Sequence, residues 1–282
     1  MKTVEDIILS SDQRGISLLR KYLQKDFCTK AAVAVLDNPG TAIIATGFYI
    51  RSAGYIETDG PPGAIAIGRA LNRLGYRVVY VTDKHGMAAL EAIADPSSIV
   101  YEFPILDSQA SNILASNICN KFDPSIMIAV ERCGINELGK YSNMHGQDIT
   151  QYTAKIDCLF QNNITSIGIG DGGNEIGMGN LKKVIPTIKN LPKDPCVTTT
   201  KELIIASCSN WGGYGLVADM SIKTGLNLLP TVDQAYQWIK KSVKNGAVEG
   251  MSGESKDWVD GRSPNEDSVC ISDLIELVET NL

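Results

Sequence analysis

The residues best suited to chemistry lie in one glycine-rich loop, which follows a short apolar run at residues 164–169. Asp171, Asn174 and Glu175 place three oxygen-bearing side chains close together in this loop. Glycine lets a backbone pass close to a ligand, and Asp, Asn and Glu supply the oxygen ligands that hard divalent cations prefer. The sequence therefore predicts a site for Mn²⁺ or Mg²⁺ at Asp171, Asn174 and Glu175. The alternative is a tight turn in which Asp171 and Asn174 bind their own backbone.

The same loop matches the glycine spacing of dinucleotide-binding folds at Gly168, Gly170 and Gly173. That motif requires a helix to begin at its glycines, so that free N–H groups face a pyrophosphate. Here the chain continues through Gly177 and Gly179, which is a poor start for a helix. We therefore interpret the match as accidental.

Chemically useful side chains also follow three other predicted strands. Glu57 and Asp59 follow the first, Glu131 and Arg132 the second, and Asn210 the third. In open α/β sheets the ligand lies outside the carboxyl ends of the strands, so parallel strands would bring all these loops to one edge. So many carboxylates repel one another unless cations intervene, which favours a bound metal.

Acid–base chemistry at this edge would use carboxylates and one histidine. Glu57 or Asp59 is predicted to act as the base. Glu131 is a further candidate, and pairing with a neighbour at the strand end is its alternative role. His145 lies in a polar loop and is a candidate for proton transfer, with a bystander role left open. The predicted catalytic residues are therefore Glu57, Asp59, Glu131 and His145.

An anionic substrate would have several candidate contacts. Arg132 and Lys140 supply positive charge, and a helix that opens at residues 61–63 offers free N–H groups to a carboxylate or phosphate. Trp211 is either a platform for the substrate or a packing aromatic. The predicted substrate-binding residues are Arg132, Lys140, Asn143, Asn210, Trp211 and Gly63.

The elements that must position these residues alternate between strands and helices along the chain. Strands are predicted at residues 41–46, 77–81, 98–103, 126–130, 164–169 and 202–208. Helices are predicted at residues 64–74, 86–94, 108–121, 150–162, 214–224, 232–244 and 271–280, with one or two more within residues 6–25. Residues 31–36 and 41–46 are interpreted as two apolar runs joined by a turn, in a hairpin or strand–turn unit. Residues 209–213 are expected to form a loop.

This alternation predicts an α/β fold with a largely parallel central sheet and helices on both faces. We expect a single domain over residues 1–282, with long loops at the carboxyl edge of the sheet. A net charge of −6 and a pI near 5.1 give no basic surface for nucleic acid or for an anionic membrane. The seven cysteines contain no Cys-x-x-Cys pair, which favours reduced thiols in a cytoplasmic protein. A homo-oligomer is left open.

Six segments of this chain resemble the D-glutamate cyclase-like C-terminal family, long catalogued only as a domain of unknown function. They are residues 46–50 (TGFYI), 57–63 (ETDGPPG), 131–132 (ER), 141–144 (YSNM), 168–180 (GIGDGGNEIGMGN) and 209–213 (SNWGG). The resemblance implies an α/β domain and conversion of D-glutamate to 5-oxo-D-proline. It also implies that an archaeal-type relative acts as a manganese-dependent phosphatase. Two positions depart from the family pattern, with Cys133 in place of a proline and His145 in place of an arginine.

The residues and the resemblance together predict a metal-dependent enzyme that cyclises D-glutamate to 5-oxo-D-proline and water. Glu57 or Asp59 would deprotonate the ammonium group, and a metal on Asp171 and Glu175 would act as the electrophile. Arg132 would anchor the α-carboxylate. The alternatives are a Mn-dependent phosphatase of small phosphate esters and a ligand-binding protein without turnover.

Overall fold

The computed structural model describes residues 2–282, which fold around one six-stranded sheet in the order β5-β4-β1-β6-β7-β8. Every strand pair in this sheet is parallel, which confirms the predicted fold class. The strands are β1 (Thr41–Thr46), β4 (Arg77–Thr82), β5 (Ile99–Glu102), β6 (Pro124–Val130), β7 (Thr165–Gly170) and β8 (Glu202–Ile205). A separate antiparallel pair consists of β2 (Tyr49–Ile50) and β3 (Tyr55–Ile56).

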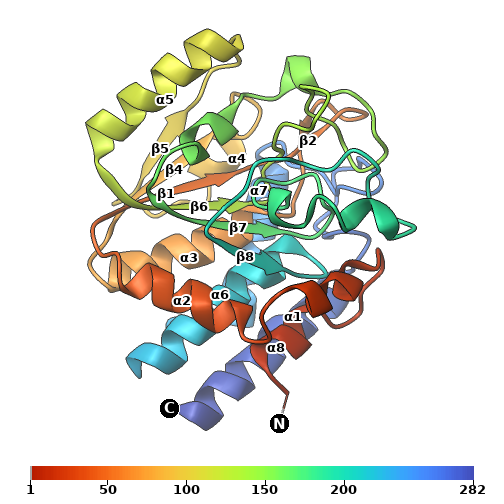
Figure 1. Cartoon of the computed structure of the whole chain (residues 1–282). Coiled ribbons are helices and arrows are strands. Elements are labelled where there is room, and N and C mark those ends of the chain that lie inside the picture. The colour runs from red at the N-terminus through yellow and green to blue at the C-terminus, as the bar shows by residue number, and fades with distance from the viewer. Residues whose placement is uncertain (1) are drawn as a thin grey trace.

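Helices cover both faces of the sheet (Figure 1). On one face lie α5 (Ser108–Phe122) and the 3₁₀ turn η3 (Ile156–Phe160), and on the other lie α2 (Phe27–Leu36), α3 (Pro61–Arg73) and α6 (Ser209–Thr224). The remaining helices are α1 (Val4–Ile8), α4 (Met87–Glu91), α7 (Val232–Lys244) and α8 (Pro264–Asn281). Shorter 3₁₀ turns are η1 (Ile16–Tyr22), η2 (Thr150–Tyr152), η4 (Gly179–Leu181) and η5 (Ile185–Thr187).

The apolar strands feed two separate cores because successive side chains of a strand point to opposite faces. In β1, Ala42 and Ile44 join the core beneath the sheet, whereas Ile43 and Ala45 join the core under α5. All four are fully buried, as expected for a parallel sheet covered on both sides. A nearly continuous apolar run in the sequence is therefore the correct signal for such a strand.

The direction in which the chain builds the sheet reverses between β1 and β6, its two central strands. Connections from β1 lead outward to β4 and β5 on one side, and those from β6 lead to β7 and β8 on the other. Such a switch point leaves a crevice at the carboxyl ends of the strands, where open α/β sheets bind their ligands. The four loops singled out in the sequence all start there or nearby.

Three predicted elements were wrong. Residues 31–36 are the second half of helix α2 and not part of a hairpin. Residues 150–162 form the short turns η2 and η3 and not one helix, because the buried carboxylate of Asp157 accepts hydrogen bonds from Tyr141, Thr198 and the Ile135 N–H. Residues 209–213 are the first turns of α6 and not a loop.

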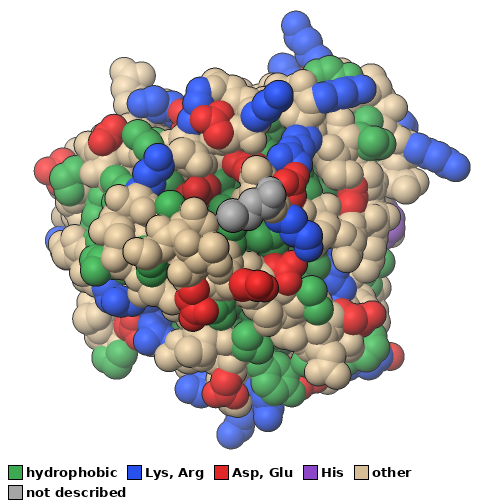
Figure 2. Space-filling view, turned by 90° about the horizontal axis from the view of Figure 1, so that it is seen from below, with side chains coloured by type: hydrophobic (Ala, Val, Ile, Leu, Met, Phe, Trp, Pro, Cys, Tyr) green, Lys and Arg blue, Asp and Glu red, His purple; other side chains and the backbone are tan. Residues whose placement is uncertain are grey.

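The surface seen from below the sheet carries acidic and basic side chains interspersed with apolar ones (Figure 2). Among the described residues, no helix is both long enough and apolar enough to cross a membrane. Helix α6 is nearly enclosed, since it packs against α3 and α2 on the sheet side and against α8 and α1 beyond it.

The close approach of α3 and α6 depends on two glycines. A Cβ atom on Gly213 would lie 2.9 Å from the Cα of Gly63, and this contact is between backbones. We expect Gly213→Ala to lower the free energy of unfolding by about 1–3 kcal/mol, because the helices must separate. This should hold although alanine is favoured over glycine by about 1 kcal/mol in an isolated helix. Urea denaturation would measure the change.

The control for this prediction is Lys223→Ala, an exposed substitution on the same helix. It should change the free energy of unfolding by less than about 0.5 kcal/mol. Equal stability of Gly213→Ala and the wild type would show that the helix contact can relax.

Candidate active site

A cavity of about 250 Å³ opens beside the switch point of the sheet. Its floor is acidic, and an aromatic and aliphatic wall is formed by Phe48, Tyr49 and Ile50. The remaining lining residues are Arg14, Arg51, Ser52, Glu57, Glu131, Asn143, Met144, His145, Gln147, Asp171, Gly172, Asn174, Gly250 and Met251. The volume is below the roughly 300–1,000 Å³ of pockets for drug-sized ligands, so it suits a small metabolite.

Three carboxylates from three different strand ends converge beside this cavity, and two of them, Glu131 and Asp171, line it. Asp59, Glu131 and Asp171 each offer an oxygen atom within 4.8 Å of the other two. They follow β3, β6 and β7 respectively, and none is more than 5% exposed. Glu131 has a φ of +45°, a backbone conformation that is rare for a residue with a side chain. This strained conformation turns the chain at the end of β6, beside the other two carboxylates.

The charge of Asp59 is stabilised by the N-terminus of helix α6. Its two oxygens accept hydrogen bonds from the backbone N–H groups of Ser209 at 2.8 Å and Asn210 at 2.7 Å. The Gly60 N–H and the Cys208 thiol also donate to it. Burial and the nearby Asp260 nevertheless raise the pKa of Asp59 to about 7.

A half-buried arginine from the N-terminal segment, 16% exposed, enters the same cluster. Arg14 forms ion pairs with Asp171 and, at 2.9 Å, with Asp260. Its position is fixed by Asp12, whose carboxylate accepts the backbone N–H groups of Arg14 and Gly15. Arg14 thereby supplies a guanidinium group to a cluster that would otherwise carry only negative charge.

The carboxylates of the cluster have shifted pKa values of both signs. Burial and the neighbouring negative charges raise the pKa of Glu57 and Glu131 well above the usual range. Burial likewise raises that of Asp171, although Arg14 opposes the shift. Burial also disfavours the ionised form of Asp260, but Arg14, a hydrogen bond with Asp171 and the charge of Arg262 together outweigh it, and the pKa of Asp260 is lowered. The cluster therefore combines carboxyl groups whose ionisation is disfavoured with one whose ionisation is favoured, a contrast that acid–base catalysis uses.

The glycine-rich loop is organised around Glu175, one of the predicted metal ligands. Its carboxylate accepts the backbone N–H groups of Asp171 at 3.0 Å, Gly172 at 2.5 Å and Gly173 at 2.6 Å. Glu175 is fully buried, and both of its oxygens accept backbone hydrogen bonds. Asn174 does line the cavity, with its amide donating to the Ser142 carbonyl at 2.9 Å.

Arg132, the predicted anchor for a substrate carboxylate, lies outside the cavity lining. Its guanidinium group donates to the Asp83 carboxylate and the Gly47 carbonyl, both at 2.7 Å, and to the Ala154 carbonyl at 2.8 Å. The side chain is 1% exposed. Its position therefore indicates that Arg132 ties three loops together, and it does not fit contact with a substrate.

Three further predicted substrate-binding residues, Gly63, Asn210 and Trp211, make contacts within the protein at helix α6. The Asn210 side chain accepts the N–H groups of Gly60 at 3.0 Å and Gly63 at 2.8 Å, so these groups are not free for an anion. Trp211 is buried, donates to Asp267 at 2.7 Å, and stacks under the Arg262 guanidinium. Trp211 is thus a packing aromatic in this structure.

The polar loop after β6 lies at the rim of the cavity. His145 and Asn143 both line it, and His145 is exposed to solvent. Lys140 is not part of the lining and pairs with Asp148 at 3.3 Å on the surface. A role for His145 in proton transfer stays a prediction.

Sequence reasoning missed the residues that the two ends of the chain contribute. Arg14 lies within residues 6–25, where one or two helices were predicted, although residues 10–15 have the composition of a turn, ending in a glycine with φ of +88°. Asp260 and the Gly250–Met251 pair lie in a Gly-, Ser- and Asp-rich segment, residues 245–267, to which no element or function was assigned. The turn composition around Arg14 was the one signal available for it.

The fold and the cavity define an α/β protein with a buried acidic site at the switch point of a parallel sheet. The chain belongs to the D-glutamate cyclase-like, C-terminal family, whose sequence model matches residues 4–275. This confirms the resemblance drawn from the sequence motifs.

Two individual proteins are similar to this chain. D-glutamate cyclase, mitochondrial, from Homo sapiens is 31% identical over 242 residues, which cover 79% of this chain and 39% of the human protein. The chain thus spans about two fifths of the length of that relative. The crystal structure of an exopolyphosphatase-related protein from Bacteroides fragilis covers 91% of this chain and 58% of its own, at 10% identity and a TM-score of 0.45. A structural similarity this weak supports no argument about function.

The raised pKa of Asp59 predicts an inverted pH dependence of stability. Between its ordinary value of 3.8 and about 7, the folded state binds a proton that the unfolded state has released. The contribution of Asp59 to the free energy of unfolding should therefore be fully present below pH 3.8 and lost as the pH rises through about 7. Urea denaturation in EDTA across this range, comparing the wild type with Asp59→Asn, measures that contribution. A difference between the two proteins that does not vary with pH would contradict the assignment.

Proposed function

We propose that this protein is a cyclase for glutamate or a close analogue, converting it to a 5-oxoproline and water. The single observation that supports this most is the small cavity, whose floor joins carboxyl groups with raised pKa values to the half-buried guanidinium group of Arg14. Membership of the D-glutamate cyclase-like family favours the same reaction.

Cyclisation needs a base for the substrate ammonium group and an acid for the departing oxygen, and Glu57 is the best candidate for the base. It lines the cavity, and its backbone is fixed on both sides, by the Phe48 carbonyl and by pairing with Val248. Its raised pKa brings a carboxylate nearer to the basicity that proton abstraction requires. Glu131 is assigned as a ligand or a proton donor on the opposite side of the same floor.

The α-carboxylate of the substrate would be held by Arg14, with Arg51 at the rim. A guanidinium group has five N–H donors, and the ion pairs to Asp171 and Asp260 use only part of them. Arg51 lies in the exposed turn between β2 and β3 and lines the same cavity. This assignment replaces Arg132 as the anchor.

The donor set also fits a divalent metal. Asp59, Glu131 and Asp171 are the residues that would hold it, since three carboxylate oxygens within 4.8 Å suit a hard cation such as Mn²⁺ or Mg²⁺. A bound metal would supply positive charge to a carboxyl oxygen of the substrate. In this proposal Asp59 and Glu131 take the metal-binding roles that the sequence assigned to Asn174 and Glu175.

The reaction itself then needs only groups in the cavity. Arg14 orients the α-carboxylate, and Glu57 removes a proton from the ammonium group. The freed amine attacks the γ-carboxyl carbon, forming the ring C–N bond, and the nitrogen then loses a second proton. The C–O bond to one carboxyl oxygen breaks, and that oxygen takes up both protons released by the nitrogen, the first of them returned by Glu57, and leaves as water. The apolar wall of Phe48, Tyr49 and Ile50 limits the access of bulk water, which would favour ring opening.

The decisive experiment incubates the wild type with D-glutamate and L-glutamate, with Mn²⁺ and with EDTA, and measures 5-oxoproline by chromatography. Arg14→Met should abolish turnover, whereas Lys140→Met, a surface control, should leave it unchanged. Loss of a charged contact in a buried site costs on the order of 2–5 kcal/mol, or about 30-fold or more. No 5-oxoproline from either enantiomer would refute the proposed reaction.

A metal-dependent phosphatase is the second candidate, because the same three carboxylates could bind a metal that activates water. The assay therefore includes a generic phosphomonoester with Mn²⁺. Phosphate release without cyclisation would support this alternative, and neither product would favour a ligand-binding protein.

The position of Glu57 depends on the absence of a side chain at residue 250. A Cβ atom on Gly250 would lie 2.0 Å from a carboxylate oxygen of Glu57, which must then move. We expect Gly250→Ala to reduce kcat by about 10- to 100-fold, in the range of a misplaced catalytic base, with little loss of stability. Steady-state kinetics together with thermal unfolding would measure both. An unchanged kcat would show that the carboxylate position of Glu57 is not important for turnover.

A further inference from the structure

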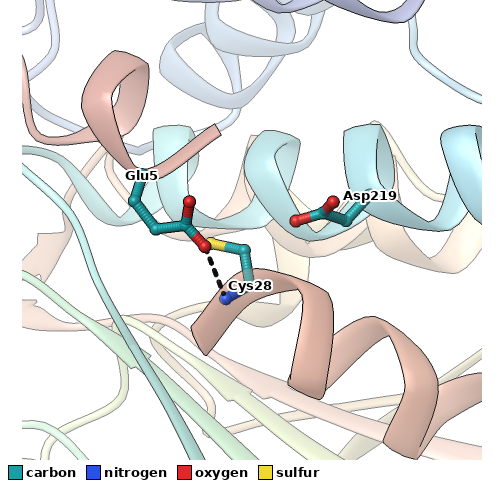
Figure 3. Close-up of side chains that lie close together, drawn as sticks. All are labelled: Glu5, Cys28 and Asp219. Carbon is teal, nitrogen blue, oxygen red and sulfur yellow. Dashed lines mark hydrogen bonds between the residues drawn. The ribbon is translucent and has the colours of Figure 1, made fainter. Parts of the chain in front are cut away.

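A second group of metal-ligating side chains lies away from the cavity, where α1, α2 and α6 meet. Glu5, Cys28 and Asp219 each offer one ligand atom within 4.8 Å of the others. Figure 3 shows the carboxylate of Asp219 reaching from α6 toward Cys28 on α2, with the Glu5 carboxylate of α1 on the other side. The three residues are far apart in the sequence and meet only in the fold.

All three side chains are buried, with Glu5 4% exposed, Cys28 0% and Asp219 6%. One oxygen of Glu5 accepts the Cys28 backbone N–H at 3.1 Å, and one oxygen of Asp219 accepts the Thr29 hydroxyl at 3.1 Å. The other oxygen of Asp219 is buried without a hydrogen-bond partner among residues 2–282. A buried carboxylate oxygen left in this state is costly unless a cation or a proton meets it.

The negative charges of Glu5 and Asp219 also lack a positively charged partner among the described residues. Within the described chain, neither Glu5 nor Asp219 forms an ion pair with a lysine or an arginine. Arg20, whose charge lowers the pKa of Cys28, pairs instead with Asp6 at 2.6 Å. Burial and the Glu5 charge raise the pKa of Asp219 to about 6, although Thr29 and Lys223 oppose the shift.

We propose that Glu5, Cys28 and Asp219 bind a structural divalent cation of the zinc class. A thiolate is a soft ligand and carboxylates are hard, and Zn²⁺ accepts both. Binding forms a metal–sulfur bond as the Cys28 S–H bond breaks, and the proton passes to solvent. The fourth position is left to a water molecule or to the second oxygen of a carboxylate.

Such a cation would fix the segment that carries Arg14 to the candidate active site. It would join α1 to the start of α2 and to the middle of α6. From α1 the chain runs directly to Arg14, and the Ile8 carbonyl already accepts the Ser207 N–H at 2.8 Å. The site is distinct from the Asp59–Glu131–Asp171 group, which offers oxygen ligands alone.

The test is a Co²⁺ and Cd²⁺ titration of the full chain after removal of metals, followed by absorbance. We expect a thiolate-to-metal charge-transfer band in the wild type that is absent in Cys28→Ser. Asp219→Asn keeps an oxygen to accept the Thr29 hydroxyl and should weaken binding by more than the 10- to 100-fold typical of changes outside the ligand shell. Cys119→Ser, which removes a partly exposed thiol elsewhere, is the matched control and should keep the band.

A second readout separates this site from the cavity. Zn²⁺ should raise the melting temperature of the wild type and of Asp171→Asn, but not of Asp219→Asn. No charge-transfer band in the wild type, or a band that persists in Cys28→Ser, would overturn the proposal. So would a zinc-induced rise in melting temperature that disappears in Asp171→Asn and persists in Asp219→Asn. If Cys28→Ser does not fold, Asp219→Asn and Glu5→Gln decide by the same two measurements.

Discussion

Burying several carboxylates at the carboxyl ends of parallel strands is the constraint on which this structure depends. An isolated buried carboxylate is strongly disfavoured, so each must accept hydrogen bonds, pair with a cation or bind a proton. Asp59 accepts hydrogen bonds from the N-terminus of α6, and Asp171 pairs with Arg14. Glu175 accepts hydrogen bonds from three backbone N–H groups of its own loop. Glu57 and Glu131 are compensated least, and their pKa values are raised accordingly.

The same constraint explains why the site is assembled from distant parts of the chain. Strand ends supply the acidic groups, but their compensation comes from α6 and from the N-terminal segment. The C-terminal loop contributes Asp260, which shares Arg14 with Asp171. Helix α6 can reach Asp59 only because Gly213 and Gly63 let α3 and α6 approach closely. The hydrogen bonds that stabilise the Asp59 carboxylate therefore depend on the close packing of the two helices.

Two of the metal-ligating groups differ in chemistry and in position. The group of Asp59, Glu131 and Asp171 is made of oxygen ligands, has a guanidinium group beside it, and lies next to space for a small ligand. The group of Glu5, Cys28 and Asp219 includes a thiol and lies where α1, α2 and α6 meet. A reaction needs an open position, whereas a structural ion is enclosed by its ligands. Their surroundings fit these separate roles.

The sequence alone determined the parallel α/β architecture, because apolar runs and helical periodicity can be read from neighbouring residues. Strands that are buried on both faces of a sheet are apolar at nearly every position, which makes these runs easy to recognise. The sequence also located the acidic loops, since Glu131 and Asp171 closely follow predicted strands and Glu57 lies in the loop after another. Tertiary structure decided which polar groups face the cavity and which hold the fold, as with Arg132 on Asp83 and Asn210 on Gly63. The residues next to a side chain in the sequence do not indicate which distant residue it will contact in the fold. Arg14 could not be placed from sequence for this reason, because its partners lie more than a hundred residues away and only folding brings them together.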